Sequence, residues 1–247
     1  MRFSVIIAFI SVFYCSGQTV LLAQQMEKGM DVSLLFGVNL GATTPVPVPN
    51  ELDITKYNPK FNPKFGATVA YYFNERWGIG TGLTLDWKGM NVHTEVDQVH
   101  LSVDGPNLGT LTGYVTGKNT TQVNTLYLVQ PVYGSFRIST KWQVKAGIYM
   151  GEVLHRKFEG DVSDVMIRVE TPVQQEREVE YVTLNYKRDV RKFDLGGLAG
   201  AEFRMNEHVG FFADFTWGFI PYFSKEVPIH FTMRNIYFSL GATYRFR

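Results

Sequence analysis

The last stretch of the chain, residues 235–247, alternates between apolar and polar or small side chains. Its apolar series occupies every second position: Ile236, Phe238, Leu240, Ala242, Tyr244 and Phe246. A strict period of two predicts a β-strand with two unlike faces, and this segment is long enough to cross a bilayer at a tilt. In a soluble sandwich such a strand would form an edge. In a chain with many similar segments and an export signal, it predicts the closing strand of a transmembrane barrel.

Seven further segments alternate in the same way. They lie at about 30–42, 61–73, 77–90, 122–137, 141–151, 190–205 and 208–219. The fourth of them is the least regular, because 126–129 is continuously apolar or aromatic and Pro131 follows. A proline inside a strand predicts a bulge or a local irregularity there.

The connections between these segments alternate between short and long. Short turns are predicted at 74–76, 138–140 and 206–207, where asparagine suits a turn because it tolerates left-handed backbone. The long connections lie at about 43–60, 91–121, 158–189 and 220–231. We therefore predict an all-β fold, an eight-stranded antiparallel up-and-down transmembrane β-barrel with short periplasmic turns and long extracellular loops.

A soluble eight-stranded barrel of lipocalin type is the alternative, with apolar side chains inside and polar ones outside. Here the polar face is rich in glycine and serine, and aromatic residues cluster at the strand ends of the other face, which favours a lipid-facing surface. Charged residues make up 19 % of the chain, against roughly 25 % in typical soluble domains. The net charge of +1 gives no electrostatic indication of a nucleic-acid partner.

The N-terminus has the layout of a secretory signal. Arg2 precedes an apolar run at 3–14, and small residues follow. We predict a signal peptide at 1–23, with a cleavage site between 17 and 25, and an outer-membrane barrel domain at 24–247; a short membrane anchor is the alternative. Cys15 is the only cysteine, so cleavage after it would leave no disulfide or thiolate metal site.

Three segments, 70–83, 126–132 and 241–247, resemble the PorT-like proteins and, more broadly, the small eight-stranded outer-membrane β-barrel family. The resemblance implies an outer membrane location in a Gram-negative bacterium and contact with outer-membrane lipid. It also implies insertion by the barrel-assembly machinery, which reads an aromatic residue at the end of the last strand. Phe246 fits this signal approximately, because Arg247 follows it. Some members of the family are linked to protein secretion.

No motif predicts a cofactor, a metal or a catalytic centre. His93 and His100 share a loop with Glu95, Asp97 and Asp104, but their spacing matches no compact metal motif. Catalysis at the rim would need a serine–histidine arrangement, for which the candidates are His155 near Glu152 and His230 near Ser224. Neither pair lies in an elbow motif, so we predict that the protein is not an enzyme and has no catalytic residues.

Charges of both signs fall on the inward face of the predicted strands. The predicted lumen network consists of Lys64, Asp86, Lys88, Lys145, Asp194, Glu202, Arg204, Asp214 and Arg245. Side chains just fill the interior of an eight-stranded barrel, so these charges should pair across it and leave no wide channel.

Function is then expected on the long loops. Weak alternation at 92–103 and 111–123 predicts a raised hairpin, and a second one is predicted above the fifth and sixth segments, turning near 172–177. We predict a structural or interaction protein with a possible protein partner at these loops and a possible accessory role in secretion. The alternatives are a small-solute channel or transporter and a lipid A-modifying enzyme.

Overall fold

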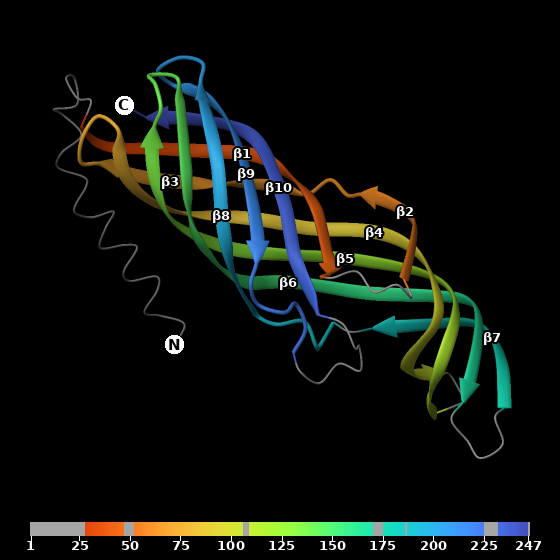
Figure 1. Ribbon diagram of the computed structural model, residues 1–247. Helices are drawn as coiled ribbons and strands as arrows, with labels where there is room; N and C mark the ends of the chain where they lie inside the picture. Colours follow the sequence, from red (N-terminus) through yellow and green to blue (C-terminus); the bar gives the residue numbers. More distant parts are fainter. Residues whose placement is uncertain are drawn as a thin grey trace.

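The computed structural model describes residues 28–46, 52–105, 109–169, 175–185, 187–224 and 232–246. The predicted signal peptide at 1–23 lies outside these residues. Eight antiparallel strands close into one ring, which confirms the predicted barrel (Figure 1). The ring strands are β1 (Gly29–Pro45), β3 (Pro63–Tyr72), β4 (Trp77–Gly105), β5 (Gly109–Arg137), β6 (Trp142–Val169), β8 (Phe193–Arg204), β9 (Val209–Gly218) and β10 (Met233–Phe246). No helix among the described residues is long and apolar enough to cross a membrane.

The first and last ring strands pair with each other and close the barrel. Their register runs from Val32 opposite Phe246 to Pro45 opposite Met233. The C-terminus therefore lies at the same rim as the start of β1 and the short turns (Figure 1). Closure leaves the terminal strand with no free edge, as the sequence predicts.

In each of the three short turns, one polar side chain accepts hydrogen bonds from main-chain N–H groups of the turn. Asn74 Oδ1 accepts hydrogen bonds from the main-chain N–H of Arg76 and Trp77, at 2.9 and 2.8 Å. In the turn after β8, Asn206 Oδ1 binds two following N–H groups in the same way, and Ser139 Oγ does so after β5. The polar side chain at each turn thus acts as a hydrogen-bond acceptor, which is a more specific role than tolerance of left-handed backbone.

Side chains alternate between an exposed outer face and a buried interior. In β10, Phe238 and Leu240 are exposed, whereas Tyr237 and Ser239 are buried. The local irregularity predicted at Pro131 is present as a gap in the β4–β5 ladder, which passes from the pair Thr81–Val132 to the pair Thr84–Val129, but there is no bulge, because the register is the same on both sides. The register shifts instead between Leu126 and Tyr127, on the side that pairs with β6. Pro131 is buried and its carbonyl accepts a hydrogen bond from Thr81 Oγ1 at 2.8 Å.

Two strands lie outside the ring and extend one side of it. β2 (Leu52–Pro59) pairs with the upper part of β4, and β7 (Gln175–Asn185) pairs with the upper part of β6. Because β4, β5 and β6 continue past the barrel, they form with these two a raised sheet in the order β2-β4-β5-β6-β7. The raised sheet curves away from one side of the rim (Figure 1).

The raised sheet confirms the hairpin predicted at 91–121, in which β4 pairs with β5 across one register irregularity between Val96 and Val99. The second hairpin differs in part from the prediction. β6 extends as expected, but its partner β7 is a separate strand, and the ring strand β8 begins only at Phe193. Of the turn predicted near 172–177, residues 175–177 belong to β7 instead, and 172–174 lie outside the described residues.

Candidate functional site

The barrel interior brings the predicted lumen charges together in pairs. Four pairs account for eight of them: Lys64 with Asp86, Lys88 with Asp194, Lys145 with Asp214, and Arg245 with Glu202. The ninth, Arg204, pairs with Asp31 of β1. The interior is therefore organised by ion pairs between neighbouring or facing strands, arranged in layers along the barrel axis.

The central layer is built around Lys88, which is only 2 % exposed. Its Nζ lies 3.5 Å from Asp194 Oδ2. Three tyrosine rings surround the ammonium group, with centroids at 4.9 Å for Tyr127, 4.7 Å for Tyr149 and 5.5 Å for Tyr237. Burying an ammonium group is costly unless a counter-charge and other favourable contacts replace its hydration. The three aromatic faces supply part of that stabilisation.

Asp194 is the acceptor at the centre of this layer. Tyr149 Oη and Asn235 Nδ2 each donate to its Oδ2 at 2.9 Å. Asn235 also donates to Tyr127 Oη at 3.1 Å and accepts from Thr43 Oγ1 at 2.8 Å. The layer thus connects six ring strands across the lumen, β1, β4, β5, β6, β8 and β10, and should stabilise the closed barrel.

Two further ion pairs lie beside the central layer. Lys145 Nζ is 2.9 Å from Asp214 Oδ1, and Lys64 Nζ is 3.2 Å from Asp86 Oδ2. Thr84 Oγ1 donates to Asp86 at 2.7 Å. The free space between these groups is a cavity of about 20 Å³, which is room for about one water molecule.

Glycines make room for the large rings of the interior. Gly196 lies directly across from Tyr149 in the β6–β8 register, and a Cβ on Gly196 would lie 2.5 Å from Tyr149 Cε1. Gly80 lies across from Tyr133 in the same way, at 2.5 Å from its Cζ. Gly196 and Gly80 therefore each leave the space that a tyrosine ring of the adjacent strand occupies.

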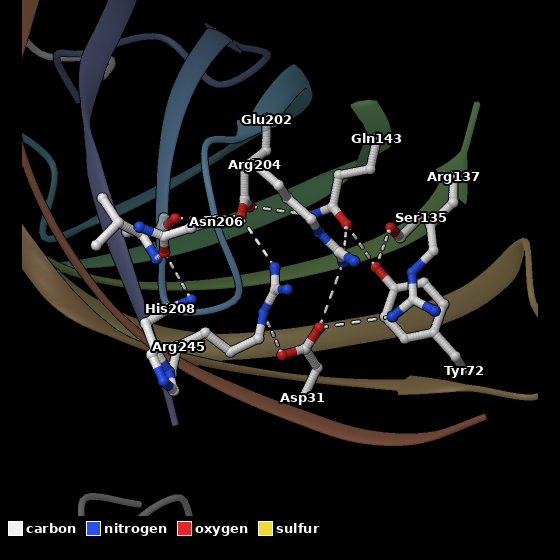
Figure 2. Close-up of polar contacts among 12 residues, drawn as sticks. Asp31, Tyr72, Ser135, Arg137, Gln143, Glu202, Arg204, Asn206, His208 and Arg245 are labelled. Carbon is white, nitrogen blue, oxygen red and sulfur yellow. Dashed lines mark hydrogen bonds and ion pairs between the residues drawn. The ribbon is translucent and has the colours of Figure 1, made fainter. Parts of the chain in front are cut away.

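The layer at the short-turn rim is centred on Asp31. Its carboxylate faces three guanidinium groups: Arg245 Nε at 2.6 Å, Arg204 Nη2 at 3.4 Å and Arg137 Nη2 at 3.6 Å (Figure 2). The guanidinium carbon of Arg137 also lies 3.4 Å from the centroid of the Tyr72 ring. One carboxylate thus offsets the mutual repulsion of three cations drawn from different strands.

Glu202 supplies the second negative charge of this layer. Its Oε1 lies 3.3 Å from Arg245 Nη2 and accepts a hydrogen bond from Thr243 at 3.1 Å. Gln143 Nε2 donates to its Oε2 at 3.0 Å, and Gln143 Oε1 in turn accepts from Tyr72 Oη at 2.8 Å (Figure 2). The network closes this end of the lumen with side chains from six of the eight ring strands.

The layer at the opposite rim is apolar. It contains Met90, Val92, Val123, Phe158, Val190, Tyr222, Phe223 and Met233, all buried. The chain segments at 189–191 and 222–224 pair with each other, through a bridge between Val190 and Phe223. Tyr222 Oη shares a 2.7 Å hydrogen bond with Thr125 Oγ1 on the barrel wall. The connection after β9 therefore folds inward and caps the lumen.

Sequence reasoning missed two members of the charged layers, Asp31 and Arg137, and the aromatic side chains of the irregular fourth strand that fill the interior, such as Tyr127. Asp31 lies on the polar face of the first predicted strand, where its parity could have placed it in the lumen. Arg137 ends the strand that contains 126–129. That stretch shows no alternation in the sequence, because Tyr127 and Val129 face an interior that is itself apolar and aromatic there. Without alternation, no parity could be assigned to the end of that strand.

The residues considered for metal or catalytic chemistry do not form a site among the described side chains. His93 Nδ1 contacts Thr120 Oγ1 at 2.9 Å, and His155 and Glu152 are exposed on β6. No group of three histidine, cysteine or acidic side chains within the described ranges is placed to hold a metal ion. The side chain of His100 and all of His230 lie outside the described set.

Comparison with known proteins identifies the type of barrel. A family model described as an outer membrane protein beta-barrel domain matches residues 22–224. A search of curated proteins finds no sequence match. Among solved structures, the chain is similar to Ail, the attachment invasion locus protein of Yersinia pestis, with 15 % identity over 90 % of this chain and 100 % of that chain, and a TM-score of 0.36. OprG from Pseudomonas aeruginosa gives 14 % identity, 90 % and 100 % coverage, and a TM-score of 0.36. Identities this low carry no information about a ligand or partner.

Proposed function

Since the chain belongs to the outer membrane protein beta-barrel domain family and lies in the outer membrane of a Gram-negative bacterium, we propose that it is a non-enzymatic interaction protein. In this proposal the filled barrel is an anchor, and the raised sheet of β2, β4, β5, β6 and β7 presents a surface to a protein partner outside the membrane. Insertion by the barrel-assembly machinery is part of the same proposal.

The main support for this proposal is the length of strands β4, β5 and β6. β4 and β5 each have 29 residues and β6 has 28, whereas a strand needs only about 9–11 residues to cross the membrane. The surplus in β4, roughly 18–20 residues, extends about 60–65 Å along the strand at about 3.3 Å per residue. The β4–β5 and β5–β6 ladders run from the barrel wall into the raised sheet, so the surface is a direct continuation of the barrel.

The interior supports an anchor over a channel or transporter. Charged layers and an apolar cap occupy the lumen, and the cavity described between them holds about one water molecule. A rim-located lipid enzyme gains no support from the described histidines, since His93 Nδ1 contacts the Thr120 hydroxyl and His155 is exposed, while His230 lies outside the described residues. The PorT-like resemblance adds the narrower proposal that the partner belongs to a secretion or envelope assembly.

Shortening the raised sheet tests the proposal. Val96 pairs with Gly117 just below a register irregularity, so residues 97–116 can be replaced by Asn-Gly, which forms a two-residue hairpin turn. We expect cross-linking in intact cells to capture a stoichiometric envelope partner with the full-length protein and not with the shortened one. The shortened barrel should still show the altered electrophoretic mobility of a folded barrel before heating.

A second variant tests the other edge of the raised sheet, because β7 can be removed separately above the pair of Glu159 and Asn185. Partner capture that survives both deletions would contradict the role of the raised sheet. Altered lipid A in a deletion strain, without any captured partner, would instead favour the enzyme alternative.

A further inference from the structure

The charged layer at the short-turn rim carries more positive than negative charge. Its guanidinium groups are those of Arg137, Arg204 and Arg245, and its carboxylates are those of Asp31 and Glu202. Three cations against two anions leave an excess of one positive charge. The three ion pairs farther inside the lumen are one-to-one instead. Of the ion-paired layers formed by the described side chains, the rim layer is therefore the unbalanced one.

Water reaches this layer from the periplasm. The three arginine side chains are 12–17 % exposed, whereas that of Lys88 is 2 % exposed, and the short turns of outer-membrane barrels lie on the periplasmic side. The exposed turn residues of the same rim are balanced among themselves, Arg76 and Lys141 against Glu75 and Glu207. The excess charge therefore lies inside the mouth, where a soluble anion can reach it.

Two of the arginines have N–H groups to spare. Arg204 donates through Nη2, to Asp31 at 3.4 Å and to Gln143 Oε1 at 2.8 Å. Arg245 contacts its two carboxylates through Nε and Nη2. A guanidinium group has five N–H donors in a planar fork, and the Nη1 atoms of these two arginines donate to no described residue. These N–H groups are left for water or for a ligand.

The three arginines are held in equivalent places, at the ends of strands that descend to this rim. The main-chain N–H of each donates to the carbonyl of the residue just before the neighbouring strand begins: Arg137 to Arg76 at 2.8 Å, Arg204 to Lys141 at 2.7 Å and Arg245 to His208 at 2.7 Å. The guanidinium carbon of Arg137 also lies 3.4 Å from the centroid of the Tyr72 ring (Figure 2). Side chains that are held in place before a ligand arrives lose little entropy on binding it.

We propose that this mouth binds a carboxylate group of a soluble periplasmic molecule, at Arg137, Arg204 and Arg245. One excess positive charge matches a monoanion, whereas a phosphate dianion would leave a net negative charge beside Asp31 and Glu202. The same arginines already contact the carboxylates of these two residues, at 2.6–3.6 Å. The planar fork of a guanidinium group matches the two oxygens of a carboxylate. The site lies at the opposite end of the barrel from the raised sheet and does not rest on the partner proposed there.

Titration with N-acetylglycine tests this site, because this small molecule ends in a carboxylate like that of a peptide. The full-length protein, with isotope-labelled arginine and folded in detergent micelles, is followed by the NMR signals of its arginine Nε–H groups. We expect a saturable shift of the Arg204 and Arg245 signals, and no shift with N-acetylglycinamide, which has no charge. Read from the Arg245 signal, Arg204→Met should weaken binding at least about tenfold, since a charge-assisted hydrogen bond is lost.

Arg76→Met is the matched control, because it removes an arginine from an exposed turn of the same rim, and its affinity should stay within about twofold of the wild type. Heat-modifiable mobility checks that each barrel is folded. A wild type that shows no saturable shift, or equal shifts with the acid and the amide, would overturn the site, and so would an equal loss of affinity in both variants. Tighter binding of inorganic phosphate than of N-acetylglycine would overturn the assignment of the ligand. If Arg204→Met does not fold, the comparison of acid and amide on the wild type decides alone.

Discussion

At the scale of single residues, Lys88 is the group whose removal should cost the barrel most. It is buried among three tyrosine rings and paired with Asp194. Lys88→Met keeps the length of the side chain but leaves the carboxylate without its counter-charge, and breaking a buried pair in this way costs about 3–5 kcal/mol. We expect that loss in the free energy of unfolding, measured by urea titration in lipid vesicles.

The companion variants separate the charge from the packing. Lys88→Met combined with Asp194→Asn removes both charges, so it should lose less than Lys88→Met alone, and the double-mutant cycle gives the coupling. Lys141→Met, in an exposed turn, should change stability by no more than about 0.5 kcal/mol. If Lys88→Met changed the free energy of unfolding as little as Lys141→Met, the central layer would not stabilise the barrel.

Period-two alternation placed most of the lumen residues correctly for a simple reason. Because successive side chains of a strand point to opposite faces, alternation distinguishes even two neighbours of the same type: Tyr71 is 55 % exposed and Tyr72 only 1 %. Parity fails where both faces are apolar, as at 126–129, because tyrosine and valine fit lipid and a filled interior equally well. That is why Tyr127 and Arg137 could not be assigned to the lumen from sequence alone.

At the scale of elements, the strand interrupted at 60–62 controls an opening in the wall: the β1–β3 ladder ends where Val38 faces Pro63, and above it β2 follows β4. Asn62 is buried there and holds β1 and β4 together. Asn62→Leu should remove about 1–2 kcal/mol of local stability, which corresponds to roughly 5–30-fold faster opening. We expect amide hydrogen exchange to accelerate by that factor in β2 and in the upper part of β1, and to stay unchanged in β8.

Asn58→Leu is the matched control, since the side chain of Asn58 makes no hydrogen bond among the described residues and lies on β2 itself. Equal acceleration in both variants would mean that any substitution near β2 loosens it, and the role given to Asn62 would then be wrong. The break itself was not visible in the sequence. Residues 43–60 were predicted as a loop, because β2 alternates weakly and its pairing depends on the extension of β4.

At the scale of the whole molecule, the ring and its closure could be predicted because many weak signals agree. Eight alternating segments, three short turns and the long connections between them leave few alternatives to an up-and-down barrel. What could not be predicted is that only some of the ring strands continue beyond the barrel. The continuation of β4, β5 and β6 into one raised sheet depends on pairing between distant segments, such as Gly113 with Val169, and local alternation does not specify such pairs.

The layered interior gives the last prediction, which concerns conductance. The Asp31 layer, the Lys88 layer and the apolar cap each cross the lumen independently, so the protein should show no stable porin-like steps in planar bilayers. Because each layer suffices, removing the cap alone with Tyr222→Ser and Phe223→Ser should leave the barrel non-conducting, although these side chains fill the mouth. Large steps in the wild type would show that the barrel is a channel. Steps that appear only when the cap is removed would show that the two charged layers do not seal the lumen and that Tyr222 and Phe223 act as its gate.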